Sequence, residues 1–276
     1  MGRGRWKSGR LGACAAVLAC LCARAAAADD TDAEPSAFGF DLRASAFFGN
    51  VTGYIQTPLG GNPGTTSPQR PTLHELGISD EPFWEVTGRL RWGQFVAFGG
   101  YSGLELDSSG TLSQSLVSHG VFFPAGSPFT TTNHLDVANF GGGWNFDFDD
   151  HRLTLFPKID VALLDFSYSL DSPGARAARA YTVTAVRLGA EGSVQLGRGF
   201  ALEFDGVTSL PIPHMPQLAN VTGRLAYHLF PSSPVRSTLF LGTGMRWIYY
   251  EDSQTVPNHI HVRTGALLTG GFSISF

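Results

Sequence analysis

Cysteine and long apolar runs are scarce in this chain of 276 residues. The three cysteines, Cys14, Cys20 and Cys22, all lie within the first 28 residues. If that segment is removed, the rest of the chain can form no disulfide and use no thiol chemistry. The longest apolar run, Leu11 to Cys22, is also shorter than the about 20 residues that a membrane-spanning helix needs. The sequence therefore predicts neither a disulfide framework nor a helical anchor.

Lysine is rarer still, because Lys158 is the only lysine after residue 28. Residues 1–28 have the pattern of a secretory signal peptide: basic residues, the apolar run, and Ala26-Ala27-Ala28 as a small-residue cleavage site. We expect cleavage before Asp29, followed by an acidic tail over residues 29–36. The segment Val17-Leu18-Ala19-Cys20 loosely resembles a lipobox, which leaves lipidation as an alternative. The basic region at the start of the signal comprises Arg3, Arg5, Lys7 and Arg10.

Positive charge is scarce in the chain that remains. Cleavage would remove five of the 19 basic residues and no acids, leaving 14 Lys and Arg against 23 Asp and Glu, a net charge of −9. This acidic balance disfavours a nucleic-acid partner. Glycine and aromatic residues are abundant, as is typical of a sheet whose outside meets lipid and whose loops must turn. A soluble β-sandwich is the competing interpretation.

The C-terminal segment from Ile260 to Phe276 alternates strictly. Its even positions are mostly apolar and its odd positions mostly small or polar, and a period of two places the two sets on opposite faces of a strand. One face suits lipid and the other suits a polar interior, as a strand of a transmembrane barrel requires.

The end of this strand resembles the C-terminal assembly signal of Gram-negative outer-membrane proteins. The residues that carry the resemblance are Thr269, Gly271, Ile274 and Phe276. The resemblance implies an outer-membrane location and recognition by the barrel-assembly machinery. It covers only the last strand and implies no activity.

Alternating runs predict ten strands in a single all-β domain, an antiparallel transmembrane barrel over residues 37–276. The connections alternate between tight turns and longer segments, which matches the short periplasmic turns and long extracellular loops of bacterial barrels. Eight or twelve strands remain alternatives, because residues 111–131 could form another hairpin. The predicted strands are 37–56, 84–92, 95–107, 133–148, 152–168, 180–196, 199–210, 218–230, 236–250 and 259–276. The predicted longer connections are 57–83, 108–132, 169–179, 211–217 and 251–258.

Aromatic residues cluster at both ends of these strands, as the interfacial girdles of membrane barrels do. The periplasmic set is Phe38, Phe40, Trp92, Phe95, Trp144, Phe146, Phe148, Phe200, Tyr227, Phe230 and Phe276. The outer set is Tyr54, Phe83, Trp84, Phe166, Tyr168, Tyr181, Trp247, Tyr249 and Tyr250.

Charged residues share one parity along most strands, since a charge that faces lipid near the midplane costs about 2 to 4 kcal/mol. Asp165 breaks this parity, through either a position beyond the apolar band or a β-bulge. The predicted lumen-lining charges are Asp41, Arg43, Glu85, Arg89, Arg91, Glu105, Asp107, Lys158, Asp160, Arg187, Glu191, Glu203, Asp205, Arg224, Arg246 and Arg263.

Because small barrels are filled by their own side chains, we expect paired charges to close this lumen. The predicted function is a non-enzymatic surface or membrane-integrity protein whose partners are outer-membrane lipid and lipopolysaccharide. A narrow channel for small solutes is the alternative. The loop 58–83 could constrict the mouth, but a solvated surface loop is favoured, with a capping box at Thr72 to Glu75.

An outer-rim enzyme is the second alternative. In strand number the chain resembles outer-membrane proteases of the omptin type, but no matching Asp-x-His pair falls at the predicted outer rim. No serine is singled out for lipid A modification, and we predict no cofactor and no metal. Histidines that fall in or near predicted outer loops are His74, His119, His134, His214, His259 and His261.

Overall fold

The computed structural model describes residues 38–55, 72–149, 152–229, 235–253 and 259–276. The predicted signal peptide, the acidic tail and the first part of the long loop lie outside the described residues. No described residue belongs to a helix long and apolar enough to cross a bilayer.

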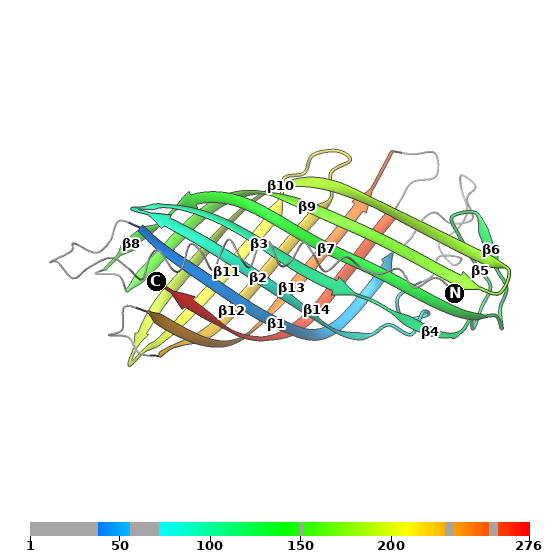
Figure 1. Cartoon of the computed structure of the whole chain (residues 1–276), viewed down its shortest axis with the longest axis horizontal. Helices are drawn as coiled ribbons and strands as arrows, with labels where there is room; N and C mark the ends of the chain where they lie inside the picture. The colour runs from blue at the N-terminus through cyan, green and yellow to red at the C-terminus, as the bar shows by residue number, and fades with distance from the viewer. Residues whose placement is uncertain (1–37, 56–71, 150–151, 230–234, 254–258) are drawn as a thin grey trace.

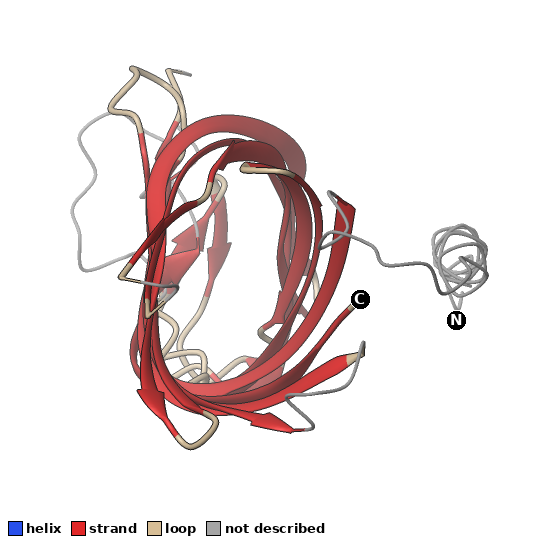
Figure 2. Cartoon of the chain, turned by 90° about the vertical axis from the view of Figure 1, so that its left-hand side faces the viewer, coloured by secondary structure: helices blue, strands red, loops and turns tan. Residues whose placement is uncertain are grey.

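Ten strands of the described chain close into one antiparallel barrel (Figures 1 and 2). Closure occurs where β14 pairs with β1, and where β7 pairs with β9 as well as with β3. The prediction of ten strands is confirmed, and a two-layer sandwich is excluded because the sheet has no second layer. The barrel strands are β1 (Phe38–Ile55), β2 (Asp80–Trp92), β3 (Phe95–Glu105), β7 (Pro128–Trp144), β9 (Leu153–Ser172), β10 (Ala175–Gly197), β11 (Phe200–Ser209), β12 (Gln217–Leu229), β13 (Arg236–Glu251) and β14 (His259–Ser275).

Four short strands extend this framework. β4 (Ser108–Thr111) continues the sheet beside β7, and β8 (Phe146–Phe148) pairs with β9. Residues 111–131 do contain a hairpin, formed by β5 (Leu116–Ser118) and β6 (Val121–Phe123). This hairpin is a separate two-stranded sheet and adds no strand to the barrel wall.

The two ends of the barrel differ. The turn end carries tight connections such as Gly93-Gln94, together with Phe38 and the C-terminus, and lies at the left of Figure 1. The loop end carries β4, β5 and β6 at the right. One predicted connection was wrong: residues 169–179 are mostly strand, and β9 turns into β10 through Pro173-Gly174, where Gly174 has a φ of 82°. Cross-strand pairing lengthens both strands beyond the point where their apolar alternation stops.

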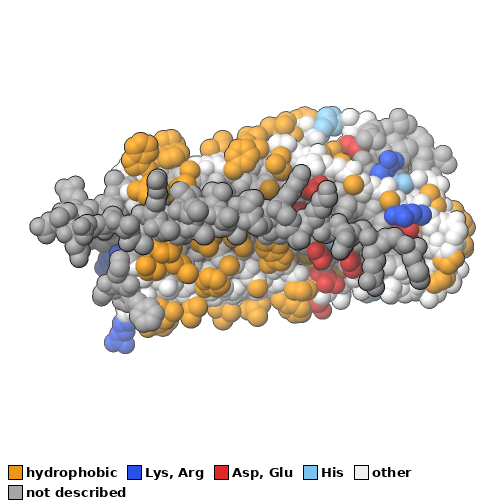
Figure 3. All heavy atoms as spheres, viewed as in Figure 1, with side chains coloured by type: hydrophobic (Ala, Val, Ile, Leu, Met, Phe, Trp, Pro, Cys, Tyr) orange, Lys and Arg blue, Asp and Glu red, His pale blue; other side chains and the backbone are white. Residues whose placement is uncertain are grey.

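A band of apolar side chains covers the outside of the barrel. On β9 the outward positions from Leu153 to Leu163 are apolar, with Ile159 51% exposed. Asp165 comes next and is also outward. Figure 3 shows that hydrophobic side chains give way to acidic ones along the length of the barrel. The register of β9 with β7 and β10 is unbroken, so Asp165 lies at the edge of the band and not at a bulge.

A bulge does interrupt β14. Between Thr264 and Leu267 this strand advances one residue more than β1 and β13 do. Ile260 and Val262 are therefore buried inside the barrel, whereas Phe272 further along is exposed on the outside. The predicted single alternation from Ile260 to Phe276 was wrong, because an extra residue exchanges the two faces.

Aromatic residues form a girdle at the turn end. The exposed members include Phe38, Trp92, Phe95, Trp144, Phe146, Phe148, Phe200, Tyr227 and Phe276. At the loop end only part of the predicted belt faces outward, with Trp84 and Tyr249 exposed. The others that are buried pack inside the mouth, and these are Phe83, Phe166, Tyr168 and Tyr250.

An apolar plug fills the loop end of the lumen. Leu73, Leu76 and Ile78 from the β1–β2 loop pack with side chains of the β3–β7 loop, among them Leu116 and Phe123. The predicted capping box is present, because the Glu75 carboxylate accepts hydrogen bonds from the Thr72 N–H and hydroxyl, both at 2.9 Å. Residues 72–79 are thus packed into the barrel mouth, and the solvated surface loop was wrong for this part.

Candidate functional site in the barrel lumen

The lumen below the plug is lined by charged side chains. Alternation places them on the inner face of seven neighbouring or facing strands, and the side chains of most are 8 to 22% exposed. Of the predicted charges, twelve lie in this inner layer: Asp41, Arg43, Glu85, Arg89, Lys158, Asp160, Arg187, Glu191, Glu203, Asp205, Arg224 and Arg246.

Lys158 joins two carboxylates at the centre of this layer. Its Nζ lies 2.7 Å from Glu191 Oε1 and 2.5 Å from Asp205 Oδ2. Glu191 also pairs with Arg89 from the opposite wall. Arg43 Nη2 lies 3.0 Å from Glu203 Oε2. These ion pairs link β1, β2, β9, β10 and β11, and water cannot screen them well because they are largely buried.

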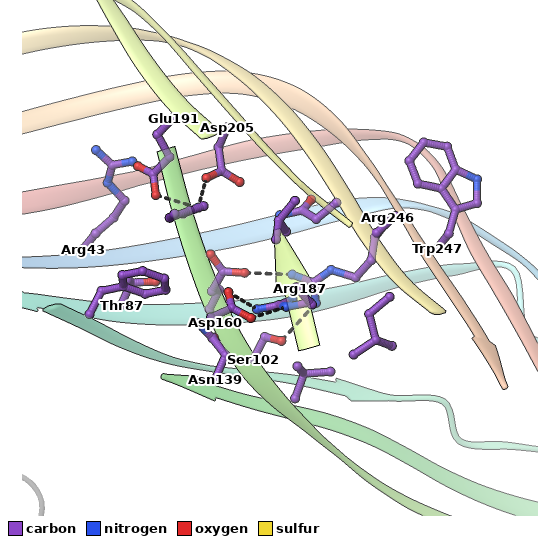
Figure 4. A pocket seen from close by; sticks show the side chains of 18 of the residues that line it. Arg43, Thr87, Ser102, Asn139, Asp160, Arg187, Glu191, Asp205, Arg246 and Trp247 are labelled. Carbon is purple, nitrogen blue, oxygen red and sulfur yellow. Dashed lines mark hydrogen bonds and ion pairs between the residues drawn. The ribbon is translucent and has the colours of Figure 1, made fainter. Parts of the chain in front are cut away.

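A second group lies closer to the plug. Arg187 makes a bidentate pair with Asp160, with Nε–Oδ1 at 2.7 Å and Nη2–Oδ2 at 2.9 Å. Arg246 donates to Glu85 Oε2 at 2.8 Å and to Ser102 Oγ at 3.0 Å. Figure 4 shows these side chains converging, with Arg187 against Asp160 and Arg246 reaching toward Ser102. Bidentate geometry adds directional constraint to the charge attraction.

Several cations of the lumen lie over the face of an aromatic ring. Arg246 lies 4.6 Å from the Phe83 ring centre, and Lys158 lies 5.6 Å from that of Phe98. Arg43 and Arg224 both lie 5.4 Å from the ring of Phe240. These contacts attract a cation to the face of the ring. The contact of Arg246 with Phe83 also joins the charged layer to the apolar plug, because Phe83 belongs to the same buried cluster.

A cavity of about 70 Å³ remains among these charges. Its lining includes Arg43, Glu85, Lys158, Asp160 and Arg224. A water molecule needs roughly 10 to 15 Å³ of such space, so the cavity suits a few waters or one small ion.

Four predicted lumen charges are not in this layer. Glu105 and Asp107 are exposed, because the inner face of β3 carries the even-numbered residues. Arg263 is exposed as well, because the β14 bulge turns it outward, where it lies over Trp247 at 5.8 Å. Arg91 has the inward parity of β2 but is exposed at the turn end.

Sequence reasoning missed part of the interior. Ser102 and the apolar plug were not predicted, although Leu73, Leu76 and Ile78 already stand out in a polar loop. That apolar spacing was the available signal for a buried loop. Outside the band, Tyr101 donates to Asp136 at 2.7 Å, which no sequence pattern indicated.

The described histidines contact different partners at the loop end. Tyr54 and Tyr249 flank His259 and His261, with ring centres 5.0 to 6.1 Å apart, and the Tyr54 hydroxyl lies 3.1 Å from His259 Nε2. His119 instead meets Tyr168 edge-on, with ring centres 6.0 Å apart. Among the described residues, no three metal-binding side chains come together.

The four residues of the proposed assembly signal lie where β14 closes the barrel. Thr269 is fully buried, and a side chain on Gly271 would collide with Ala44 O and the Phe240 ring. Phe276 packs near Phe40 with ring centres 6.2 Å apart. Packing where the barrel closes therefore explains the glycine at 271 and the burial of Thr269, independently of any recognition during assembly.

The closed antiparallel barrel, its apolar outer band and its aromatic girdle define a transmembrane β-barrel of the outer-membrane type. Solved structures with a similar fold include three from Gram-negative outer membranes. They are the outer membrane protease OmpT from Escherichia coli (9% identity, 90% of this chain and 99% of that one, TM-score 0.42), the attachment invasion locus protein Ail of Yersinia pestis (8%, 86% and 99%, 0.32) and Neisserial surface protein A (14%, 87% and 98%, 0.28). At these scores the likeness carries no argument about activity.

No family model and no curated protein matches the chain.

Proposed function

We propose that the protein is a non-conducting outer-membrane barrel that serves as a rigid support for the segments at its loop end, in a surface or membrane-integrity role. The observation that carries this proposal is the closure of the lumen by two successive layers. Ion-paired charges occupy the inner layer and buried leucines the outer one, and about 70 Å³ remains between the walls. A solute path would have to break both layers.

The proposal extends to processing and partners. We infer cleavage before Asp29, recognition of the Phe276 end by the barrel-assembly machinery, and outer-membrane lipid and lipopolysaccharide as the surroundings of the apolar band. Exposed Trp84 and Tyr101 beside acidic Asp136 and Asp165 are suited to the level where acyl chains meet headgroups.

Planar-bilayer recording tests the closed lumen against the channel alternative. We expect purified protein in the membrane to give no conductance steps above background, while a general porin added to the same bilayer does. A variant with Leu73→Asp and Leu76→Asp disrupts only the outer layer, and we expect it to stay silent because the charged layer remains. Regular steps from the unaltered protein would overturn the proposal in favour of a narrow channel.

A further inference from the structure

Arg224 on β12 differs from the other cations of the lumen. It is 4% exposed and lines the cavity, yet among the described residues it forms no ion pair. The remaining cavity-lining cations each pair with a carboxylate, and these are Arg43, Arg89, Lys158, Arg187 and Arg246. A buried cation without a counter-charge is unfavourable unless something else neutralises it.

Arg43 makes the burial of the Arg224 charge more unfavourable, because the two like charges lie close together. Both guanidinium groups lie 5.4 Å from the Phe240 ring, so two like charges share one aromatic partner. The Nε–H group of each is buried and has no hydrogen-bond acceptor among the described residues. A ring face attracts a cation but accepts no in-plane N–H bond, so these donors remain unsatisfied.

The residues that line the cavity carry more positive than negative charge. Among the described residues its lining holds six cations and only four carboxylates. Glu203 pairs with Arg43 and Asp41 lies opposite Arg89, so the layer as a whole holds six cations and six carboxylates, and Arg224 is the cation of the wall that no described carboxylate reaches within ion-pair distance. Water could accept the free N–H bonds but would bring no counter-charge to Arg224.

We propose that the cavity binds one small inorganic anion of the halide class, held by Arg224 together with Arg43. A monovalent anion accepts the free N–H bonds and gives Arg224 the counter-charge it lacks, and a halide fits a volume of about 70 Å³. The anion would act as a structural ion that fastens β12 to β1 across the lumen. This inference is independent of conduction, because a bound structural ion needs no path through the plug.

Thermal unfolding of the full chain in detergent micelles tests the site. Sodium bromide is compared with sodium gluconate, whose anion is too large to enter, from 10 mM to 1 M at constant sodium. We expect bromide to raise the Tm by about 3 °C, because a ligand that binds only the folded state stabilises it as its concentration grows. Arg224→Met should remove the bromide dependence. Arg91→Met, which removes an exposed cation outside the cavity, should keep it.

Two results would overturn the site. Equal Tm values in bromide and gluconate would mean that water fills the cavity, and a bromide dependence that persists in Arg224→Met would place the anion elsewhere. Because Arg224→Met could fail to fold, crystals of the unaltered protein refolded and grown in bromide give a second measurement. An anomalous peak beside Arg224 supports the proposal, and a cavity without one contradicts it. Silent bilayers leave this result unaffected, so the two proposals fail separately.

Discussion

Some residues of this barrel stabilise it through the side-chain atoms they contribute, and others through the side-chain atoms they lack. Lys158 pairs with two carboxylates at once, so its loss would leave buried Asp205 without an ion-pair partner and Glu191 with Arg89 alone. Gly271 contributes no side chain, and the space beside it is taken by Ala44 O and by the Phe240 ring. That ring is the one on which Arg43 and Arg224 lie, so packing at β14 and charge at β12 depend on the same side chain.

Gly271→Ala should destabilise the barrel by about 1 to 3 kcal/mol, as overpacking of a filled interior does. The added Cβ would lie 2.1 Å from Ala44 O and 2.6 Å from Phe240 Cζ, so β1 or the ring must move. Urea unfolding in detergent or lipid measures the change. Gly223→Ala is the matched control, since nothing lies within 4 Å of the Cβ it would add. Equal stability of the two variants would contradict the packing argument.

Among the elements, the β5–β6 hairpin connects the plug to the barrel wall. Leu116 and Phe123 enter the apolar cluster, and the Ser118 hydroxyl lies 2.9 Å from that of Tyr168 on β9. His119 forms the turn at a φ of 47° and its Nδ1 accepts a hydrogen bond from Arg179 Nε at 3.2 Å. Burial, aided by the charge of Arg179, lowers the pKa of His119 to about 4.

The hairpin should therefore loosen in acid. A histidine whose folded pKa lies below its unfolded value near 6.5 binds more protons when unfolded, so its stabilising contribution is complete above pH 6.5 and is lost as pH falls toward 4. Amide protection of residues 116–123, corrected for intrinsic exchange, should drop between pH 7 and pH 4.5. His119→Gln keeps an acceptor for Arg179 without a titrating ring and should flatten this drop, whereas exposed His74→Gln should not. A drop unchanged by His119→Gln would exclude this histidine as the cause.

At the scale of the whole molecule, the barrel has three zones along its axis. Aromatic side chains ring the turn end, apolar ones cover the middle, and Asp136 and Asp165 begin the polar loop end. On β9 the apolar outward positions run over six alternate residues, Leu153 to Leu163. In a strand tilted by about 40° this corresponds to a band of roughly 25 Å, the height found in outer-membrane barrels.

A charge scan along β9 tests where hydrocarbon begins and ends. Ile159→Arg places a cation in the middle of the band and should cost about 2 to 4 kcal/mol of folding free energy in lipid vesicles. Asp165→Arg at the band edge should change stability by less than about 1 kcal/mol. Denaturant titration in vesicles measures both variants. A similar cost at the two positions would mean that the orange zone of Figure 3 does not face lipid.

The sequence by itself determined the barrel, its ten strands, the distinction between its turn end and its loop end, and most of its inward charges. These follow from side-chain alternation and from the lengths of the connections, which are local properties of the chain. It did not determine the faces of Glu105 and Arg263. Glu105 faces outward because the even-numbered residues of β3 point inward, and Arg263 is turned outward by the one-residue offset of the β14 bulge, which pairing with β1 and β13 fixes. Only the tertiary structure decided which charges meet, that the 72–79 segment closes the mouth, and that Arg224 has no ion-pair partner among the described residues. Those features depend on side chains from strands far apart in sequence that closure of the barrel brings to the same level.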